Sequence, residues 1–361
     1  MLIYETKSGE KVYRMDNTII VFFPGPRLVI STSRINGGIR EDLEAVFNHC
    51  LPPEKCLVKN LPNGSAEQYL EQLAAKLHLP PKRTAGLLTA ARMENIAIKA
   101  AGFQQLEVTA LVTAGVDVNG GRAGDPAAYH EADGQYTVLG GTINIILIIN
   151  GNLSPYTLVR TVVTATEAKT AALQELMAPS RYSRGIATGS GTDQIIVVSN
   201  PSSLYRYTDA GKHSKLGELI GSAVKDAVKE ALYKETGLGP ERQRNFLARW
   251  ARYGIKDEDF WQEARRDGAI LSREMFIERL NRLAGEERLV TLAAALIHLL
   301  DEYTWGLLSA GLVMEIGEKL IQSFAGKVST CNRVHDPPDY LSRLFIELTI
   351  KLLDSSAEFN C

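Results

Sequence analysis

The sequence predicts an α+β domain with mixed α/β layers and a mixed sheet, followed by an all-helical module. Over residues 1–236, strand-like and helix-like segments intermix without the strict alternation of a parallel α/β fold. Residues 237–240, Gly-Leu-Gly-Pro, have the composition of a linker. Over residues 240–361 only helical periodicity remains, and a module of about 120 residues has the usual size of a domain.

The first segments of the chain predict short strands. Residues 11–31 alternate apolar and polar side chains and turn at Pro24-Gly25-Pro26, which favours antiparallel strands. Helices are expected near residues 40–47 and 66–77. Further strands are expected at residues 84–90 and 106–113, and the continuous apolar run at 142–150 predicts a strand buried on both faces.

A long helix is predicted after this strand. Ser154 can cap it, Pro155 suits its first position, and its apolar residues follow a period of 3.6. Lys169 falls in the middle of that apolar stripe, whereas Glu167 points to the opposite face as a solvated acid. A lysine in this position either snorkels to solvent or meets a carboxylate or an oxyanion. We expect it to be paired, with Asp193 or Asp125 as its partner.

The remaining elements follow from the same periodicities. A strand is predicted at residues 194–199 and an amphipathic helix at 215–233. Beyond the linker, helices are predicted at the segments 241–253, 272–283, 286–302, 305–324 and 340–353. We expect this module to form an interface, such as that of a homo-oligomer, because its titratable residues lie on amphipathic helices.

Composition excludes several classes of function. The formal charge of −2 and the lack of a basic run with interleaved aromatics predict no nucleic-acid partner. The apolar region 289–314 is broken by Asp301 and Glu302, so no membrane span is expected. Residues 1–16 lack a signal-peptide core, which predicts a cytoplasmic protein. The four cysteines form no CxxC pair, only Cys331 and His335 approach metal-ligand spacing, and no metal site is predicted.

Three polar loops are candidates for a binding site. Residues 31–38, 119–126 and 188–193 combine glycines, which allow close approach to a ligand, with short hydrogen-bonding side chains. We expect them to line one cleft, although none matches a Walker or dinucleotide motif, and neither GxSxG nor HExxH occurs. His130 is either a surface residue or a base or metal ligand, and His213 is expected to face the same cleft as Asp193.

Several of these strings resemble one family. Residues 140–145 (Gly-Gly-Thr-Ile-Asn-Ile), 164–173 and 187–193, with 113–116 leading to 122–125, are similar in content and order to the adenosylcobinamide amidohydrolase family of corrinoid salvage. The resemblance covers about residues 10–235. Ser190 stands where a threonine is more usual, so the hydroxyl is retained. Residues 240–361 are not explained by this resemblance.

The resemblance implies hydrolysis of the amide that joins aminopropanol to the corrin ring, giving adenosylcobyric acid and 1-amino-2-propanol for adenosylcobalamin synthesis. It implies a corrinoid substrate that carries its own cobalt, and no further cofactor. The alternatives are a non-catalytic corrinoid-binding or transfer protein, and an enzyme acting on another small polar amide. A binder needs shape and hydrogen bonds but no base beside the amide.

Chemical roles follow from what amide hydrolysis needs, namely an activated water or nucleophile, a stabilised oxyanion and a proton for the leaving amine. Asp193 or Asp125 is the expected base, Lys169 or His130 the acid, and Thr142 an alternative nucleophile. Backbone N–H groups around residues 140–142 or 189–191 are expected oxyanion donors. The expected substrate-binding residues are Asn36, Gly37, Asn119, Arg122, Asn144, Glu167, Thr188, Gly189, Ser190, Gly191, Thr192 and His213.

Overall fold

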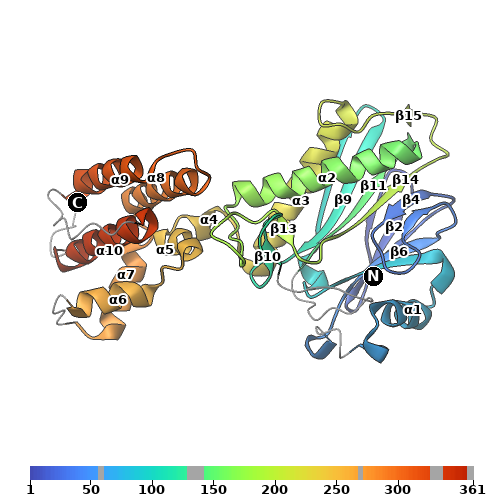
Figure 1. Ribbon diagram of the computed structural model, residues 1–361. Coiled ribbons are helices and arrows are strands. Elements are labelled where there is room, and N and C mark those ends of the chain that lie inside the picture. Colours follow the sequence, from blue (N-terminus) through green and yellow to red (C-terminus); the bar gives the residue numbers. More distant parts are fainter. Residues whose placement is uncertain (56–60, 128–141, 267–270, 326–335, 356–361) are drawn as a thin grey trace. The chain divides into compact units, whose positions relative to one another are not determined.

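The computed structural model describes residues 1–55, 61–127, 142–266, 271–325 and 336–355 (Figure 1). The chain divides into two compact units, Met1–Gly239 and Pro240–Cys361. Each unit has its own hydrophobic core, and each is described separately below.

The first unit contains two mixed sheets. The five-stranded sheet has the order β1 (Leu2–Glu5), β2 (Lys11–Met15), β3 (Thr18–Phe22), β6 (Ala45–Cys50), β7 (Thr84–Thr89). The six-stranded sheet has the order β5 (Gly38–Arg40), β4 (Leu28–Ser31), β14 (Gln194–Ser199), β11 (Ile143–Ile149), β9 (Leu106–Ala114), β8 (Ala97–Phe103). β6 runs parallel to β7 and β11 parallel to β14, whereas the other neighbours in these sheets are antiparallel. The predicted mixed sheet is confirmed.

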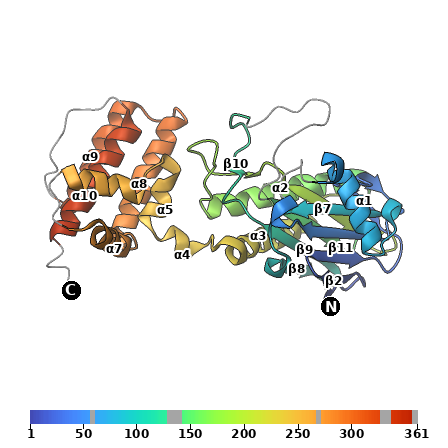
Figure 2. The same ribbon diagram turned by 90° about the horizontal axis from the view of Figure 1, so that it is seen from below.

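Alternating side chains of the central strands divide the unit into layers. Ile146 and Ile148 pack with Ile19 of the other sheet in a core between the two sheets. Ile145 and Leu147 face the opposite way and pack against α2 (Pro155–Glu175) and α3 (Lys215–Thr236). The other sheet packs its outer face on α1 (Ala66–Lys76). The order of layers is therefore helices, sheet, sheet, helix, and Figures 1 and 2 show α2 running along the strands.

Local sequence explains the elements that frame the site. Ser154 accepts a hydrogen bond from the backbone of Thr157 at the start of α2, where Pro155 occupies the first helical position. Ser214 caps α3 in the same way, and Gly237 ends that helix in the left-handed conformation with φ 69°. All seven residues of β11 are buried, as its continuous apolar run predicts.

The predicted helix at residues 40–47 is wrong. The segment contains the end of β5 and the start of β6, and all six residues of β6 are buried between β3 and β7. In a short segment that is buried on both faces, the pattern of apolar residues does not distinguish a strand from a helix. The structure also adds β1, β8 and helix α6, which the sequence analysis does not predict.

Short elements complete the first unit. Two-stranded ribbons join β10 (Gly120–Gly121) to β13 (Gly189–Ser190), and β12 (Asn152–Leu153) to β15 (Arg206–Tyr207). Single 3-10 turns lie at Pro53–Lys55, Pro62–Gly64, Pro81–Arg83 and Met93–Asn95.

The second unit is helical throughout its described elements. They are α4 (Pro240–Gln243), α5 (Phe246–Trp250), a 3-10 turn (Ala251–Tyr253), α6 (Asp257–Arg266), α7 (Arg273–Leu283), α8 (Glu287–Thr304), α9 (Ala310–Ala325) and α10 (Pro337–Ser355). The segment predicted as a helix from residue 305 starts at Ala310 instead, because Gly306 adopts φ 74° after α8.

A buried ion pair explains the charge inside the most apolar stretch of this unit. Arg252 donates to both oxygens of Asp301, at 2.9 and 2.6 Å, and the Tyr253 hydroxyl donates to Asp301 at 2.8 Å. Asp301 therefore belongs to the core of the unit and has three donors there. None of the helices in the described parts of the chain has the length and apolar character needed to cross a membrane.

Candidate functional site

The site lies at one edge of the six-stranded sheet. β11 and β14 are parallel neighbours and both begin at this edge, where the antiparallel β9 ends with Ala114 opposite Ile143. The β10–β13 ribbon joins two of the predicted polar loops here. Thr188 donates its N–H to the carbonyl of Gly121 at 2.9 Å, and Ala123 donates its N–H to the Thr188 hydroxyl at 2.9 Å. Strand topology thus brings together loops 119–126 and 188–193.

A cavity of about 520 Å³ opens between this ribbon and α2. Its size is within the range of small-molecule sites, ~300–1,000 Å³. It is lined by Gly121, Arg122, Ala123, Asp125, Pro126, Thr166, Lys169, Thr170, Tyr182, Thr188, Gly189, Ser190, Gly191 and Asp193. Eight of the residues proposed from the sequence are in that wall: Arg122, Asp125, Lys169, Thr188, Gly189, Ser190, Gly191 and Asp193.

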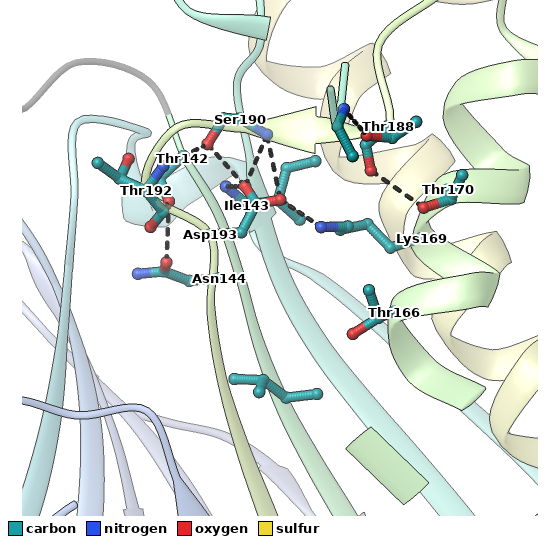
Figure 3. Close-up of polar contacts among 12 residues, drawn as sticks. Thr142, Ile143, Asn144, Thr166, Lys169, Thr170, Thr188, Ser190, Thr192 and Asp193 are labelled. Carbon is teal, nitrogen blue, oxygen red and sulfur yellow. Dashed lines mark hydrogen bonds and ion pairs between the residues drawn. The ribbon is translucent and has the colours of Figure 1, made fainter. Parts of the chain in front are cut away.

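Lys169 and Asp193 form an ion pair in the cavity wall. α2 directs the Lys169 ammonium toward the Asp193 carboxylate, which immediately precedes β14 (Figure 3). Lys169 is only 8% exposed, so the prediction that this lysine is paired inside the protein is confirmed. Snorkelling to solvent, the alternative interpretation, is wrong, because the carboxylate compensates the charge within the wall.

The Asp193 carboxylate accepts further hydrogen bonds. The N–H of Ser190 lies 3.1 Å from both of its oxygens, the Ser190 hydroxyl donates to Oδ1 at 2.6 Å, and Ile143 donates its N–H to Oδ1 at 3.1 Å. These donors occupy acceptor positions of the carboxylate beside the Lys169 ammonium. The arrangement therefore holds an anion at the start of β14 and a cation on α2, in direct contact.

Gly189 is required by this close approach. A Cβ atom at this position would overlap Asp193 Oδ2 and would lie 2.7 Å from Lys169 Nζ. Any other side chain would separate the two charges. The glycine-rich string that marks this loop in the sequence thus has a steric reason.

Thr142 lies behind the site, and its side chain is not part of the described cavity wall. Its hydroxyl donates to the carbonyl of Thr192 at 2.6 Å and lies 3.3 Å from Asn144 Oδ1 (Figure 3). Asn144 in turn donates to Asn48 Oδ1 at 2.7 Å and to the carbonyl of Leu88 at 2.9 Å. Thr142, Asn144 and Thr192 therefore belong to a buried polar network that links the two sheets. The hydroxyl that contacts the Asp193 carboxylate is that of Ser190.

Asp125 lies in the cavity wall and is held by its own loop. It accepts hydrogen bonds from the Ser180 hydroxyl at 2.6 Å and from the N–H of Arg122 at 3.0 Å. Burial acts to raise the pKa of Asp125, but hydrogen bonds from Ser180, Ser183 and the Arg122 backbone, with the Arg122 charge, outweigh it and lower the pKa. Asp125 is therefore ionised at neutral pH and is a weak base.

The third polar loop starts beside β14, where Thr32 and Ile195 exchange hydrogen bonds, but it is not part of the described cavity wall. Asn36 donates to the carbonyls of Pro81 and Thr84, both at 2.7 Å, and a Cβ on Gly37 would overlap the carbonyl of Ser33. These contacts hold residues 31–38 against the segment that leads into β7. Asn36 and Gly37 are absent from the described cavity wall.

The remaining predicted residues are distributed around the site. Glu167 is exposed and pairs with Lys212 at 2.9 Å, as expected of a solvated acid, and His213 is exposed at the start of α3. Asn119 is buried beside the ribbon, behind the described wall. His130 and the expected oxyanion donors Gly140 and Gly141 lie outside the residues that the structure describes. Within the described residues, no group of three His, Cys, Asp or Glu side chains could hold a metal ion.

Sequence reasoning missed Thr166, Thr170 and Tyr182 in the cavity wall. The two threonines had a detectable signal, because they lie three residues before and one residue after Lys169 on the same helix. Tyr182 had none, since its segment has no periodic pattern.

Comparison with known proteins identifies the family. The family model described as adenosylcobinamide amidohydrolase matches residues 3–240. An uncharacterized protein of Methanocaldococcus jannaschii is 38% identical over 231 residues, which are 60% of this chain and 86% of that protein. The adenosylcobinamide amidohydrolase of Methanosarcina mazei is 30% identical over 225 residues, 60% of this chain and 94% of that protein.

Similarity to solved structures is weak. A protein of Pyrococcus horikoshii matches with a TM-score of 0.29 and 12% identity, over 65% of this chain and 82% of that one. A Burkholderia β-aminopeptidase matches with a TM-score of 0.30 and 11% identity, over 68% and 82%. The assignment therefore depends on the sequence match, which spans nearly all of the first unit and confirms the resemblance carried by the strings around the cavity. The chain belongs to the adenosylcobinamide amidohydrolase family, a family of hydrolases.

Proposed function

We propose that this chain hydrolyses the amide that links aminopropanol to the corrin ring of adenosylcobinamide, in the cavity between α2 and the β10–β13 ribbon. The products would be adenosylcobyric acid and 1-amino-2-propanol, of which the first can be reused in cobalamin synthesis. Membership of the family supports the substrate. The observation that carries the location is the ion pair of Lys169 and Asp193 in the cavity wall.

Lys169 acts as the electrophile in this proposal. Its ammonium is in contact with the Asp193 carboxylate, and its low exposure strengthens its field at a carbonyl oxygen in the cavity. An ammonium at this place stabilises the negative charge that develops on that oxygen. It also supplies the proton that the leaving amine needs when the C–N bond breaks.

Asp193 takes the proton of the attacking water. The water oxygen bonds to the amide carbon, its proton passes to the carboxylate, and the C–N bond then breaks as Lys169 protonates the amine. Asp193 and Lys169 are in direct contact, so the proton then passes from the Asp193 carboxyl group to the Lys169 side-chain amine. This transfer restores the carboxylate and the ammonium. Asp125, also in the wall, is the second candidate for the base.

The non-catalytic alternative is a corrinoid-binding or transfer protein. Burying an ion pair in the cavity wall costs desolvation energy. A protein that only recognises the shape of a large ring does not need such a pair. The ion pair therefore favours hydrolysis. Stoichiometric binding of adenosylcobinamide without release of aminopropanol would support the carrier instead.

The first prediction is that purified protein releases aminopropanol from adenosylcobinamide without added metal. The roles of acid and base are assigned above to Lys169 and Asp193, so we expect activity to survive treatment with a chelator. Free aminopropanol should be quantified by mass spectrometry, with boiled enzyme as the control. Activity that is lost with the chelator and restored by a divalent ion would contradict the metal-free mechanism.

The second prediction concerns the helical unit, which we propose forms an interface, such as that of a homo-oligomer. α9 and the segment before it expose Trp305, Leu307, Leu312 and Ile316. A chain ending at Gly239 keeps Leu238, which is buried in the core of the first unit. We expect this truncated chain to retain measurable hydrolysis and to change oligomeric state or solubility in light scattering. A well-folded truncate without any activity would show that the helical unit contributes to the site.

A further inference from the structure

The outer face of α2 carries an exposed apolar stripe. Tyr156 is 60% exposed, Val159 49% and Val163 41%. They are spaced by three and four residues, so they lie on one face of the helix. The solvent-facing side of an amphipathic helix is normally polar, and apolar side chains clustered there mark contact surfaces.

This stripe leads directly to the cavity. Thr166 and Thr170 continue the same spacing of three and four residues, and both line the cavity beside Lys169. The Thr166 hydroxyl donates to the carbonyl of Val162 at 2.8 Å, and that of Thr170 to the carbonyl of Thr188 at 3.1 Å. Their hydroxyl protons are therefore already engaged. We call the five side chains Tyr156, Val159, Val163, Thr166 and Thr170 the α2 stripe.

The size of the cavity restricts what can enter it. A volume of about 520 Å³ suits a single drug-sized group. Adenosylcobinamide, with its corrin ring, peripheral amide arms and adenosyl group, is far larger. Only the arm that carries the scissile amide can enter, so the ring must rest on the surface beside the opening. The α2 stripe borders that opening and extends about 21 Å from Tyr156 to Thr170, at ~1.5 Å per residue.

We propose that the α2 stripe supports the corrin ring of the substrate while the aminopropanol arm reaches Lys169 and Asp193. This inference rests on the proposed function, and it names the surface that selects a corrinoid over a small amide. A second copy of the chain is a weaker candidate for the occupant. A stable dimer buries ~800 Å² on each partner, more than a stripe of three apolar side chains supplies.

The proposal predicts a specific kinetic signature. The ring does not change when the amide is cleaved, so contacts with it bind substrate and transition state equally. Loss of such contacts raises KM and leaves kcat unchanged. Substitutions in the α2 stripe should therefore differ from substitutions at Lys169 or Asp193, which act on kcat.

The test uses the full-length Val159→Asp/Val163→Asp double variant. Adenosylcobinamide kinetics should show a KM raised about tenfold or more, with kcat within about threefold, because charges replace two valine side chains that the bound ring would cover. The Val159→Ala/Val163→Ala variant, which adds no charge, should shift KM in the same direction by less. Met15→Asp is the matched control, since Met15 is 44% exposed on β2 of the other sheet, and its KM should be unchanged.

Binding without turnover separates this inference from the proposed function. Spectroscopic titration with adenosylcobyric acid should show weaker binding by the double variant than by wild type. Wild type that binds corrinoids but releases no aminopropanol would contradict the proposed function and leave the stripe supported if the variant loses binding. Unchanged KM and unchanged corrinoid affinity in both valine variants would overturn the inference. If KM and corrinoid affinity are unchanged but the valine variants differ from wild type in oligomeric state, the stripe forms contacts between copies of the chain instead.

Discussion

Replacing Lys169 with methionine is expected to cost about 3 kcal/mol in stability, in activity or in both, the lower end of the range for breaking a buried pair. Methionine keeps the length of the side chain but removes the charge. The Asp193 carboxylate then loses its cation and, among the residues that the structure describes, keeps the donors from Ser190 and Ile143. If the whole cost appears in kcat/KM, it corresponds to about a hundredfold loss.

Two measurements divide that cost. The midpoint of thermal unfolding reports the structural part, and single-turnover release of aminopropanol reports the catalytic part. Lys225→Met is the matched control, because Lys225 pairs with Glu175 at 3.1 Å on the exposed surface and such pairs contribute little. A Lys169→Met enzyme that matches wild type in both measurements would show that the pair has no role.

Replacing Asp193 with asparagine is expected to lower turnover by at least about a hundredfold, the scale typical of losing a general base. Asparagine has nearly the same shape, and its carbonyl oxygen can still accept from Ser190. Its amide cannot take a proton from water, and the Lys169 ammonium loses the carboxylate with which it is paired. The rate should be measured at saturating adenosylcobinamide, because the expected loss is in kcat.

The Asp193 result needs two comparisons. Asp125→Asn tests the other carboxylate of the wall, and near-normal turnover of Asp193→Asn would move the base to Asp125 or His130. A double-mutant cycle with Lys169→Met tests whether the two charges act as a unit. For groups in direct contact we expect strongly non-additive losses, whereas additive losses would indicate independent roles.

The position of the main chemical groups was accessible from the sequence because it depends on local patterns. The 3.6-residue period around Lys169 places the lysine on the buried side of α2 whatever the helix packs against. Its charge then requires a nearby anion, and the structure supplies Asp193. The glycine beside that pair is likewise part of a recognisable sequence string. The steric reason for it appears only in the structure.

Local patterns gave a wrong prediction where the secondary structure depends on pairing with distant strands. β6 is a short run buried between β3 and β7, and its partners lie far away in the sequence. The loops show the same limit. All three have the composition of a binding loop, but only 119–126 and 188–193 line the described cavity. Residues 31–38 start beside β14 at Thr32 and are held at Asn36 against the segment that leads into β7.

The sequence alone therefore determined the family and the capped helix that carries Lys169 on its buried side, because each depends on contiguous residues. Only the tertiary structure decided that the first unit has two sheets, that Ser190 and not Thr142 contacts the Asp193 carboxylate, and that the α2 stripe meets the cavity. These features depend on which strands pair and in which register. That choice is made by the packing of apolar side chains from distant segments, and no local window of the sequence contains it.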